Sequence, residues 1–135
     1  MEYLTELKMT DDALRGMSAL ALAHIGDAVY ELLARTRVCA EGRLTSGGLH
    51  RATVELVCAR AQYEAAKRVL PVLTDGERDV LNRGRNAKVH AVPKGSSFEE
   101  YHMATALESL FGWLYLKGEL ARVRELFEVC TGGGE

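Results

Sequence analysis

The chain has 135 residues, of which 47% are hydrophobic and 27% charged, the composition of an ordinary soluble globular domain. Its 17 basic and 19 acidic residues give a net charge of −2, which argues against a general nucleic-acid binder but leaves room for local basic clusters. No apolar stretch reaches the roughly 18 residues that a membrane span needs, and the acidic N-terminus lacks the features of a secretory signal. We therefore expect one cytoplasmic domain over residues 1–135, with reduced thiols in apolar surroundings at Cys39, Cys58 and Cys130.

Helical patterns follow one another along the chain, and strand-like alternation is absent. The pattern predicts a short helix near residues 10–14 and a long one over residues 17–40. The long segment is apolar almost all round, so we expect it to be central and buried. Residues 41–51, with three glycines, are predicted to form a loop. A third helix is predicted over residues 49–70, because the residue before Pro71 disfavours helical geometry.

Two capping boxes, Thr74 with Glu77 and Ser97 with Glu100, predict the starts of two more helices. The first fades at 82–88, a loop follows over 89–97, and the second helix lasts to about residue 117. A final amphipathic helix carries one apolar stripe, made of Leu120, Val123, Phe127 and Cys130. The chain is therefore predicted to be all-α, with five to seven helices.

Two of the most apolar helices each carry a carboxylate close to a glycine. Asp27 follows Gly26 in "LALAHIGDAVYELLAR", and Glu108 precedes Gly112 in "ATALESLFGWLYL". Glycine costs helix stability but lets a second backbone or a ligand approach closely. If these helices pack together, the two acids converge, and converging carboxylates repel unless a proton or a cation lies between them. Oxygen ligands of this kind suit Mg²⁺, with Mn²⁺ as an alternative.

Structural explanations stand beside this one. Asp27 could be paired with an arginine from another helix, since buried acids are usually paired. Glu108 could reach the edge of its helix and solvent. Glu31 is expected to pair with Arg35 at a spacing of four residues, which is a structural role.

The stretch "NRGRNAK", residues 82–88, concentrates guanidinium groups around a glycine at a helix end. These cations could simply complement the negative end of the helix dipole. Alternatively they could contact phosphates, because the arginine fork matches phosphate geometry and asparagine can bind sugar or base edges. The residues alone leave both readings open.

Taken together, these segments resemble the ribonuclease III family. "LALAHIGDAVYELLARTRV" resembles its signature helix, and "RGRNAK", a loop and "ATALESLFGWLYL" are similar to the small bacterial branch called Mini-ribonuclease III. The resemblance covers about residues 18–127. It implies an all-helical, homodimeric endonuclease domain that cleaves double-stranded RNA with Mg²⁺ and leaves 5′-phosphate ends. It also leads us to expect no room for the double-stranded RNA-binding domain of longer relatives.

The resemblance also assigns roles to the two acids. Asp27 matches the catalytic aspartate after the signature glycine, and Glu108 matches the acidic residue of the later helix, so both would hold the metal ion. Larger relatives place two further acids where this chain has Ala23 and Thr105, as the small branch generally does. The bound ion would activate a water molecule and stabilise the leaving oxygen.

Without a second domain, the catalytic domain would have to bind the RNA itself. We expect these contacts from "GRLTSGGLHR" and "RGRNAKVHAVPK", two segments whose glycines, Gly84 among them, would let the backbone approach a groove. The candidate side chains are Arg43, His50, Arg51, Arg83, Arg85, Asn86, Lys88 and Lys94.

The family's usual substrate is the precursor of 23S ribosomal RNA, in some species with the help of a large-subunit ribosomal protein. The homodimer interface is expected on the apolar surface of the signature helix. Two other functions remain open: a catalytically silent helical RNA-binding or ribosome-associated module, and a helical interaction protein that binds no RNA.

Overall fold

The structure, a computed structural model, describes residues 8–42, 45–87 and 97–132. These residues form seven α-helices and one 3-10 helix and contain no strand, which confirms the predicted all-α fold. The helices are α1 (Asp11–Arg15), α2 (Ala19–Ala40), α3 (Ser46–Val57), α4 (Ala59–Val69), η1 (Leu70–Val72), α5 (Asp75–Arg85), α6 (Phe98–Leu116) and α7 (Leu120–Cys130). None of the described helices combines the length and apolar character that crossing a membrane requires.

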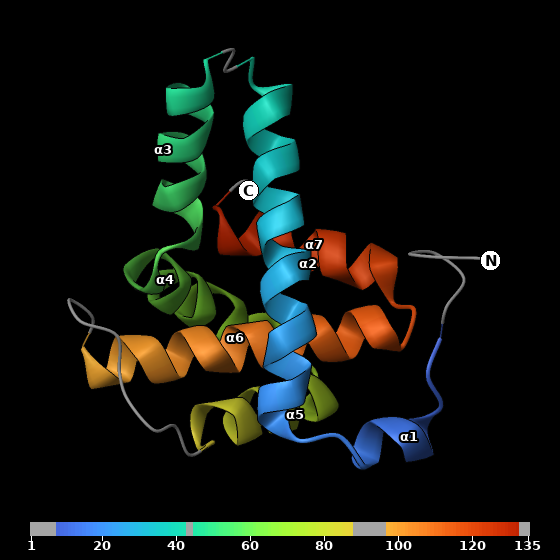
Figure 1. The fold of residues 1–135 in the computed structure, drawn as a ribbon. Coiled ribbons are helices and arrows are strands. Elements are labelled where there is room, and N and C mark those ends of the chain that lie inside the picture. Colours follow the sequence, from blue (N-terminus) through green and yellow to red (C-terminus); the bar gives the residue numbers. More distant parts are fainter. Residues whose placement is uncertain (1–7, 43–44, 88–96, 133–135) are drawn as a thin grey trace.

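Helix α6 is the centre of the fold, and α2, α4, α5 and α7 pack around it (Figure 1). Its buried side chains lie on every side of the helix axis. In the core, the ring of Tyr30 from α2 packs edge-on against Phe111 of α6, with centroids 5.0 Å apart. Tyr30 also packs against Phe127 of α7 in the same manner, at 5.2 Å, so the two aromatic contacts join three helices.

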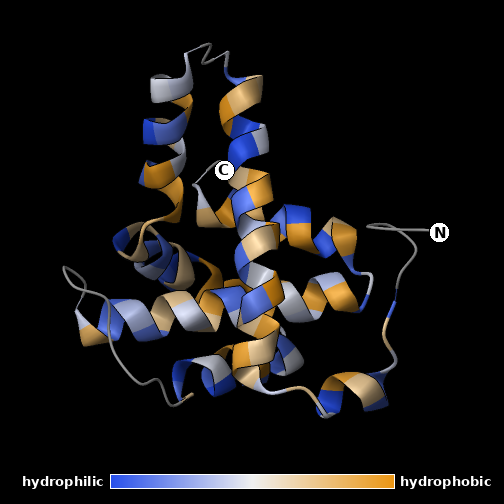
Figure 2. Ribbon diagram, in the orientation of Figure 1, coloured by the Kyte–Doolittle hydropathy of each residue, from blue (hydrophilic) through white to orange (hydrophobic). Residues whose placement is uncertain are grey.

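The prediction that residues 17–40 form the central, buried helix is wrong, because α2 buries only one of its faces. Another face of α2 is exposed or half-buried and mostly polar, and hydrophobic and hydrophilic colours alternate along the helix in Figure 2. We call this face the α2 stripe; its residues are Leu20, His24, Asp27, Glu31 and Arg35. The predicted pair is confirmed, since Arg35 Nε donates to Glu31 Oε2 at 2.8 Å. Helix burial follows the periodic arrangement of side chains and not their mean hydropathy.

Helices α2 and α6 cross with their backbones in direct contact. A Cβ atom added to Gly26 would lie 1.6 Å from the carbonyl oxygen of Glu108, and one added to Gly112 would lie 2.0 Å from the carbonyl oxygen of Leu22. No side chain fits at either position, so each glycine is needed for the close approach. Of the two alternatives that the sequence left open for these glycines, a backbone and not a ligand occupies the space.

The predicted helix over residues 49–70 is two helices, because the chain turns sharply at Cys58. This residue has extended backbone angles, φ −64° and ψ 159°, between α3 and α4. The predicted loop over 41–51 is also shorter, since α3 begins at Ser46 and the Thr45 side chain caps it by accepting from Gly48 N. The break lets α3 form a hairpin with α2 while α4 turns to pack on α6 (Figure 1).

Both predicted capping boxes are confirmed, at Thr74 with Glu77 and at Ser97 with Glu100. The expectation of apolar surroundings for all three cysteines is only partly right. Cys130 is buried, but Cys39 and Cys58 are exposed, because they lie at a helix end and at the break between α3 and α4.

The glycine crossing leads to a stability prediction. Gly26→Ala and Gly112→Ala should each lower the free energy of unfolding by about 3 kcal/mol or more, because the added methyl group forces two backbones apart. Gly76→Ala in α5 is the matched control, since its Cβ atom would meet only Trp113 at 3.8 Å. That control should be neutral or stabilising by about 0.5 to 1 kcal/mol. Urea unfolding followed by circular dichroism measures all three; equal stabilities would contradict the crossing.

Candidate active site

The helix crossing brings Asp27 and Glu108 together. Asp27 directly follows Gly26, whose Cα faces the Glu108 backbone, so the two acids lie on adjoining sides of one contact. Asp27 is exposed and Glu108 is half-buried. The pKa of Glu108 is raised to about 8, first by burial and then by the charge of the neighbouring Asp27 and a side-chain hydrogen bond with it. In the metal-free protein, Glu108 therefore keeps a proton near neutral pH and donates it to the Asp27 carboxylate.

Neither acid forms an ion pair within residues 8–42, 45–87 and 97–132. The alternative in which an arginine from another helix neutralises Asp27 thus finds no such partner among these residues. Glu108 is half-buried, and its side chain meets Asp27 and the side chain of Gln62. Near neutral pH the two acids therefore share one proton and one negative charge, which no ion pair within the described residues neutralises.

Gln62 of α4 is the third side chain at this site, and sequence analysis missed it. It is only 3% exposed, and its hydrogen bond to Glu108 lowers the pKa of that carboxyl, opposing the effects of burial and of Asp27. Reading residues 49–70 as one helix placed Tyr63 on the apolar face, whereas the break at Cys58 turns Gln62 inward. A signal was present: Gln62 is the only glutamine of the chain and shares one helix face with Ala65, Ala66 and Val69.

The donor set fits a hard divalent cation. The described residues contain no cluster of three or more histidine, cysteine, aspartate or glutamate side chains, so Asp27 and Glu108 are a pair. Mg²⁺ is typically held by one or two carboxylates, while water and substrate phosphate complete its shell. An exposed carboxylate, a half-buried one and an amide that donates to the latter supply oxygen ligands of the required kind. His24 is exposed beside Asp27 in the same shallow groove.

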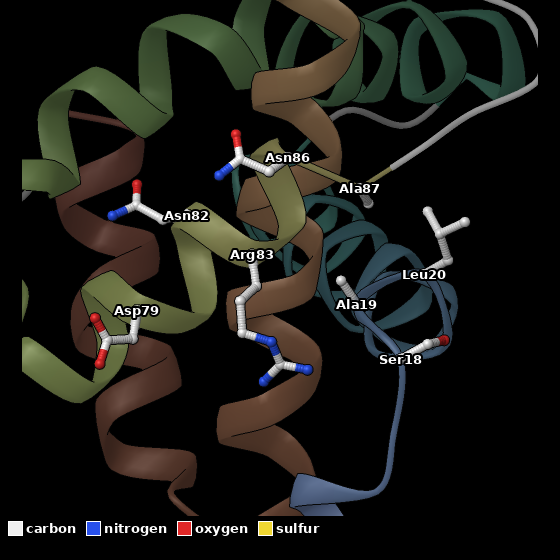
Figure 3. A pocket seen from close by; sticks show the side chains of 8 residues that line it. All are labelled: Ser18, Ala19, Leu20, Asp79, Asn82, Arg83, Asn86 and Ala87. Atoms are coloured by element: carbon white, nitrogen blue, oxygen red, sulfur yellow. The ribbon is translucent and has the colours of Figure 1, made fainter.

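The RNA-binding candidates that the structure describes lie near opposite ends of the α2 stripe. Arg83 and Asn86 line a pocket with Leu20, at the start of the stripe (Figure 3). His50 of α3 lines a groove with Arg35, at the other end. The stripe from Leu20 to Arg35 is about 22 Å long at 1.5 Å per residue, with Asp27 near its middle. Arg51 and Arg85 are also exposed, and three candidates lie outside the described residues: Arg43, Lys88 and Lys94.

Both arginines of "RGR", residues 83–85 at the end of α5, contact neighbouring segments of the fold. Arg83 Nη2 donates to the Met17 carbonyl at 3.1 Å, and Arg85 Nη2 lies 3.5 Å from Glu99 Oε1. The prediction that Gly84 lets the backbone approach an RNA groove is wrong. Gly84 is buried against α6, and a Cβ atom there would lie 2.6 Å from Ser109 Oγ, so this glycine serves helix packing.

The raised pKa of Glu108 predicts a pH-dependent stability. In the unfolded chain this carboxyl titrates near 4.5, whereas in the folded protein it titrates near 8. Between these values the folded protein holds a proton that the unfolded chain has released, so the metal-free protein should lose stability as pH rises through this window. Glu108→Gln cannot ionise and should be the more stable protein above about pH 8.

Urea unfolding in EDTA across this pH window measures the effect. Glu64→Gln, which removes a half-buried partner of Arg60 and Lys67, is the control and should keep the wild-type slope. The same slope in Glu108→Gln and in wild type would contradict the burial of Glu108 beside Asp27.

Comparisons with known proteins agree with these observations. A family model described as Ribonuclease III domain matches residues 20–119. The chain is 42% identical to the "Mini-ribonuclease 3" of Thermoanaerobacter sp., over 94% of this chain and 89% of that protein. It is 41% identical to the "Mini-ribonuclease 3" of Symbiobacterium thermophilum, over 83% of this chain and 86% of that protein.

A solved structure is similar as well. The crystal structure of a protein from Fusobacterium nucleatum superposes with a TM-score of 0.80 at 27% sequence identity, covering 90% of this chain and 98% of that one. Sequence, fold and the two converging acids thus lead to one conclusion: the chain belongs to the ribonuclease III family, in its Mini-ribonuclease III branch, and is an endoribonuclease.

Proposed function

We propose that this endoribonuclease cleaves double-stranded RNA with a divalent ion, Mg²⁺ or in its place Mn²⁺, held by Asp27 and Glu108. The observation that carries the proposal is the pair of carboxylates meeting at the α2–α6 crossing without a cation partner in the described part of the chain. A catalytically silent RNA-binding module would have no need of such a pair, which costs stability. The family supplies duplex RNA as the substrate class.

Each residue at the site has a distinct role in this proposal. When bound, the ion supplies Lewis acidity at the scissile phosphate and at the attacking water. Asp27, exposed on the α2 stripe, would hold the ion where a phosphate of the RNA backbone can reach it. Glu108 releases the proton that it holds in the metal-free protein and so becomes an anionic ligand. Gln62 donates to Glu108 and keeps its carboxylate turned towards Asp27.

The RNA would lie along the α2 stripe, which explains why the basic candidates flank Asp27 on both sides. Arg83, Arg85 and Asn86 would contact one side of the cleavage point, and His50 and Arg51 the other. Arg43, Lys88 and Lys94 remain predictions from the sequence. With a net charge of −2 and so few cations, the binding should be weak and should fall steeply with added salt.

We also propose a homodimer with a second copy docked on the apolar side of α2. A groove there is lined almost entirely by apolar side chains, and its rim carries Leu32, which is 56% exposed. It shares Ile25, Ala28 and Leu32 with the groove that contains Asp27, so the interface would adjoin the active site. Two-fold symmetry would place two such sites on one duplex, one for each strand.

The proposed natural substrate is the precursor of 23S ribosomal RNA in the cytoplasm, in some species aided by a large-subunit ribosomal protein. This part rests on the family resemblance alone. Mapping the ends of ribosomal RNA in cells that lack the protein tests it, and normal 23S ends would reject this substrate.

The catalytic assignment predicts the behaviour of two variants. Asp27→Asn and Glu108→Gln should each reduce cleavage of duplex RNA in Mg²⁺ by at least about 1,000-fold while the protein still folds, because each removes an anionic ligand. Glu64→Gln is the matched control and should cleave like wild type. EDTA should stop all cleavage. Wild-type binding without cleavage would favour the silent module, and cleavage by either variant would show that the acids are misassigned.

The dimer proposal predicts the effect of a charge in the apolar groove. Leu32→Arg should convert the dimer to a monomer, because an unpaired guanidinium cannot be buried in an apolar interface without a large penalty. Val72→Arg, on an exposed apolar residue of η1 outside this groove, should remain dimeric. Analytical ultracentrifugation distinguishes the two states. A monomeric wild-type protein, or a dimeric Leu32→Arg protein, would contradict the interface.

A further inference from the structure

The pocket between the start of α2 and the exposed face of α5 has a composition that needs explaining. It has a volume of about 730 Å³ and contains the polar side chains of Ser18, Asp79, Asn82, Arg83 and Asn86 (Figure 3). From these residues we infer that the pocket is a ribose site, which recognises the 2′-hydroxyl groups of duplex RNA. The inference deepens the proposed function and rests on it.

The first observation is the placement of the side-chain amides. The chain has only two asparagines, Asn82 and Asn86, and both line this one pocket. They lie four residues apart at the end of α5 and extend to the same side of the helix (Figure 3). Both are exposed, and neither side chain hydrogen-bonds to another group of the described protein. Their donors and acceptors are therefore available to a ligand.

The second observation is the charge balance of the pocket. Asp79 lies four residues before Arg83, so a carboxylate accompanies the pocket's arginine. Arg83 is already engaged, since it donates to the Met17 carbonyl at 3.1 Å and ties α5 to the start of α2. A phosphate would meet the repulsion of Asp79, whereas a hydroxyl group can donate to a carboxylate and accept from an amide. The mixed set favours a hydroxyl ligand over a phosphate.

Ser18 adds a further hydroxyl partner. Its Oγ accepts from Ala21 N at 3.1 Å as the cap of α2, which leaves its own proton free to donate. The 2′-hydroxyl both donates and accepts, and it is the group by which a protein tells RNA from DNA. Duplex RNA displays these hydroxyls in its wide, shallow minor groove, where side chains of an open surface pocket can reach them.

The third observation is the distance from the acids. Leu20 of the pocket and Asp27 lie on the same stripe of α2, seven residues or about 10 Å apart. A ribose in this pocket would therefore belong to a nucleotide near the one that is cut. The pocket would couple recognition of RNA to the position of cleavage.

The test separates hydroxyl from phosphate contacts. Binding of Asp27→Asn protein, which should leave the RNA intact, is measured by fluorescence anisotropy against two duplexes of one sequence. One is all-ribose; the other carries 2′-fluoro groups, which keep the A-form shape but cannot donate a hydrogen bond. The protein should bind the all-ribose duplex about 10-fold more tightly, which corresponds to about 1.4 kcal/mol, because the hydrogen bonds donated by the 2′-hydroxyl groups are lost in the other duplex.

Two further variants decide the assignment. In the same background, Asn82→Ala with Asn86→Ala should weaken binding of the all-ribose duplex about 10-fold and leave the 2′-fluoro duplex unchanged, which abolishes the preference. Arg85→Ala, a candidate phosphate contact outside the pocket, should weaken both duplexes equally. Equal weakening of both duplexes by the asparagine double variant, or no weakening, would overturn the ribose site.

Failure of this inference is distinguishable from failure of the proposed function. Cleavage of duplex RNA by the wild-type protein and by the asparagine double variant, with an unchanged 2′-hydroxyl preference in binding, would reject the ribose site alone. Absence of binding and cleavage by wild type would reject the proposed function.

Discussion

The contact between the backbones of α2 and α6 at Gly26 and Gly112 is the constraint on which the rest of the structure depends. It fixes the distance and angle of two helices that neither a side chain nor a solvent molecule separates. Because Asp27 and Glu108 lie immediately beside this contact, their separation is set by main-chain packing and not by flexible side chains. A site built on rigid elements in this way holds its ligands more accurately than one built on loops.

The acid pair lowers the stability of the folded protein, and the hydrophobic core offsets this loss. Burial and mutual repulsion disfavour the ionised state of Glu108, as its raised pKa records. The apolar interior around α6, with Tyr30, Phe111 and Phe127 at its centre, supplies the compensating stability. Active sites commonly contain residues that lower the stability of the fold, because the arrangement that costs stability also serves the chemistry.

The features that sequence reasoning predicted are those decided by local physics. The capping boxes at Thr74 and Ser97 and the pairing of Glu31 with Arg35 depend only on neighbours along one helix. The break at Cys58 has no glycine or proline to mark it, because it arises from the separate packing of α3 on α2 and α4 on α6. Because the break was not predicted, Gln62 was not predicted at the site either. The helical register of α4 decides whether Gln62 or Tyr63 points inward. The packing role of Gly84 was not predicted either, because its neighbour on α6 is distant in sequence.

The position of Gln62 has a consequence for how such a site can change over time. Two of its three walls, α2 and α6, are locked together without space for substitution at their glycines. Helix α4 contributes Gln62, whose side chain lowers the pKa of Glu108 and is not part of the glycine contact. Substitutions at this one position can therefore change how readily Glu108 ionises while the crossing of α2 and α6 stays intact.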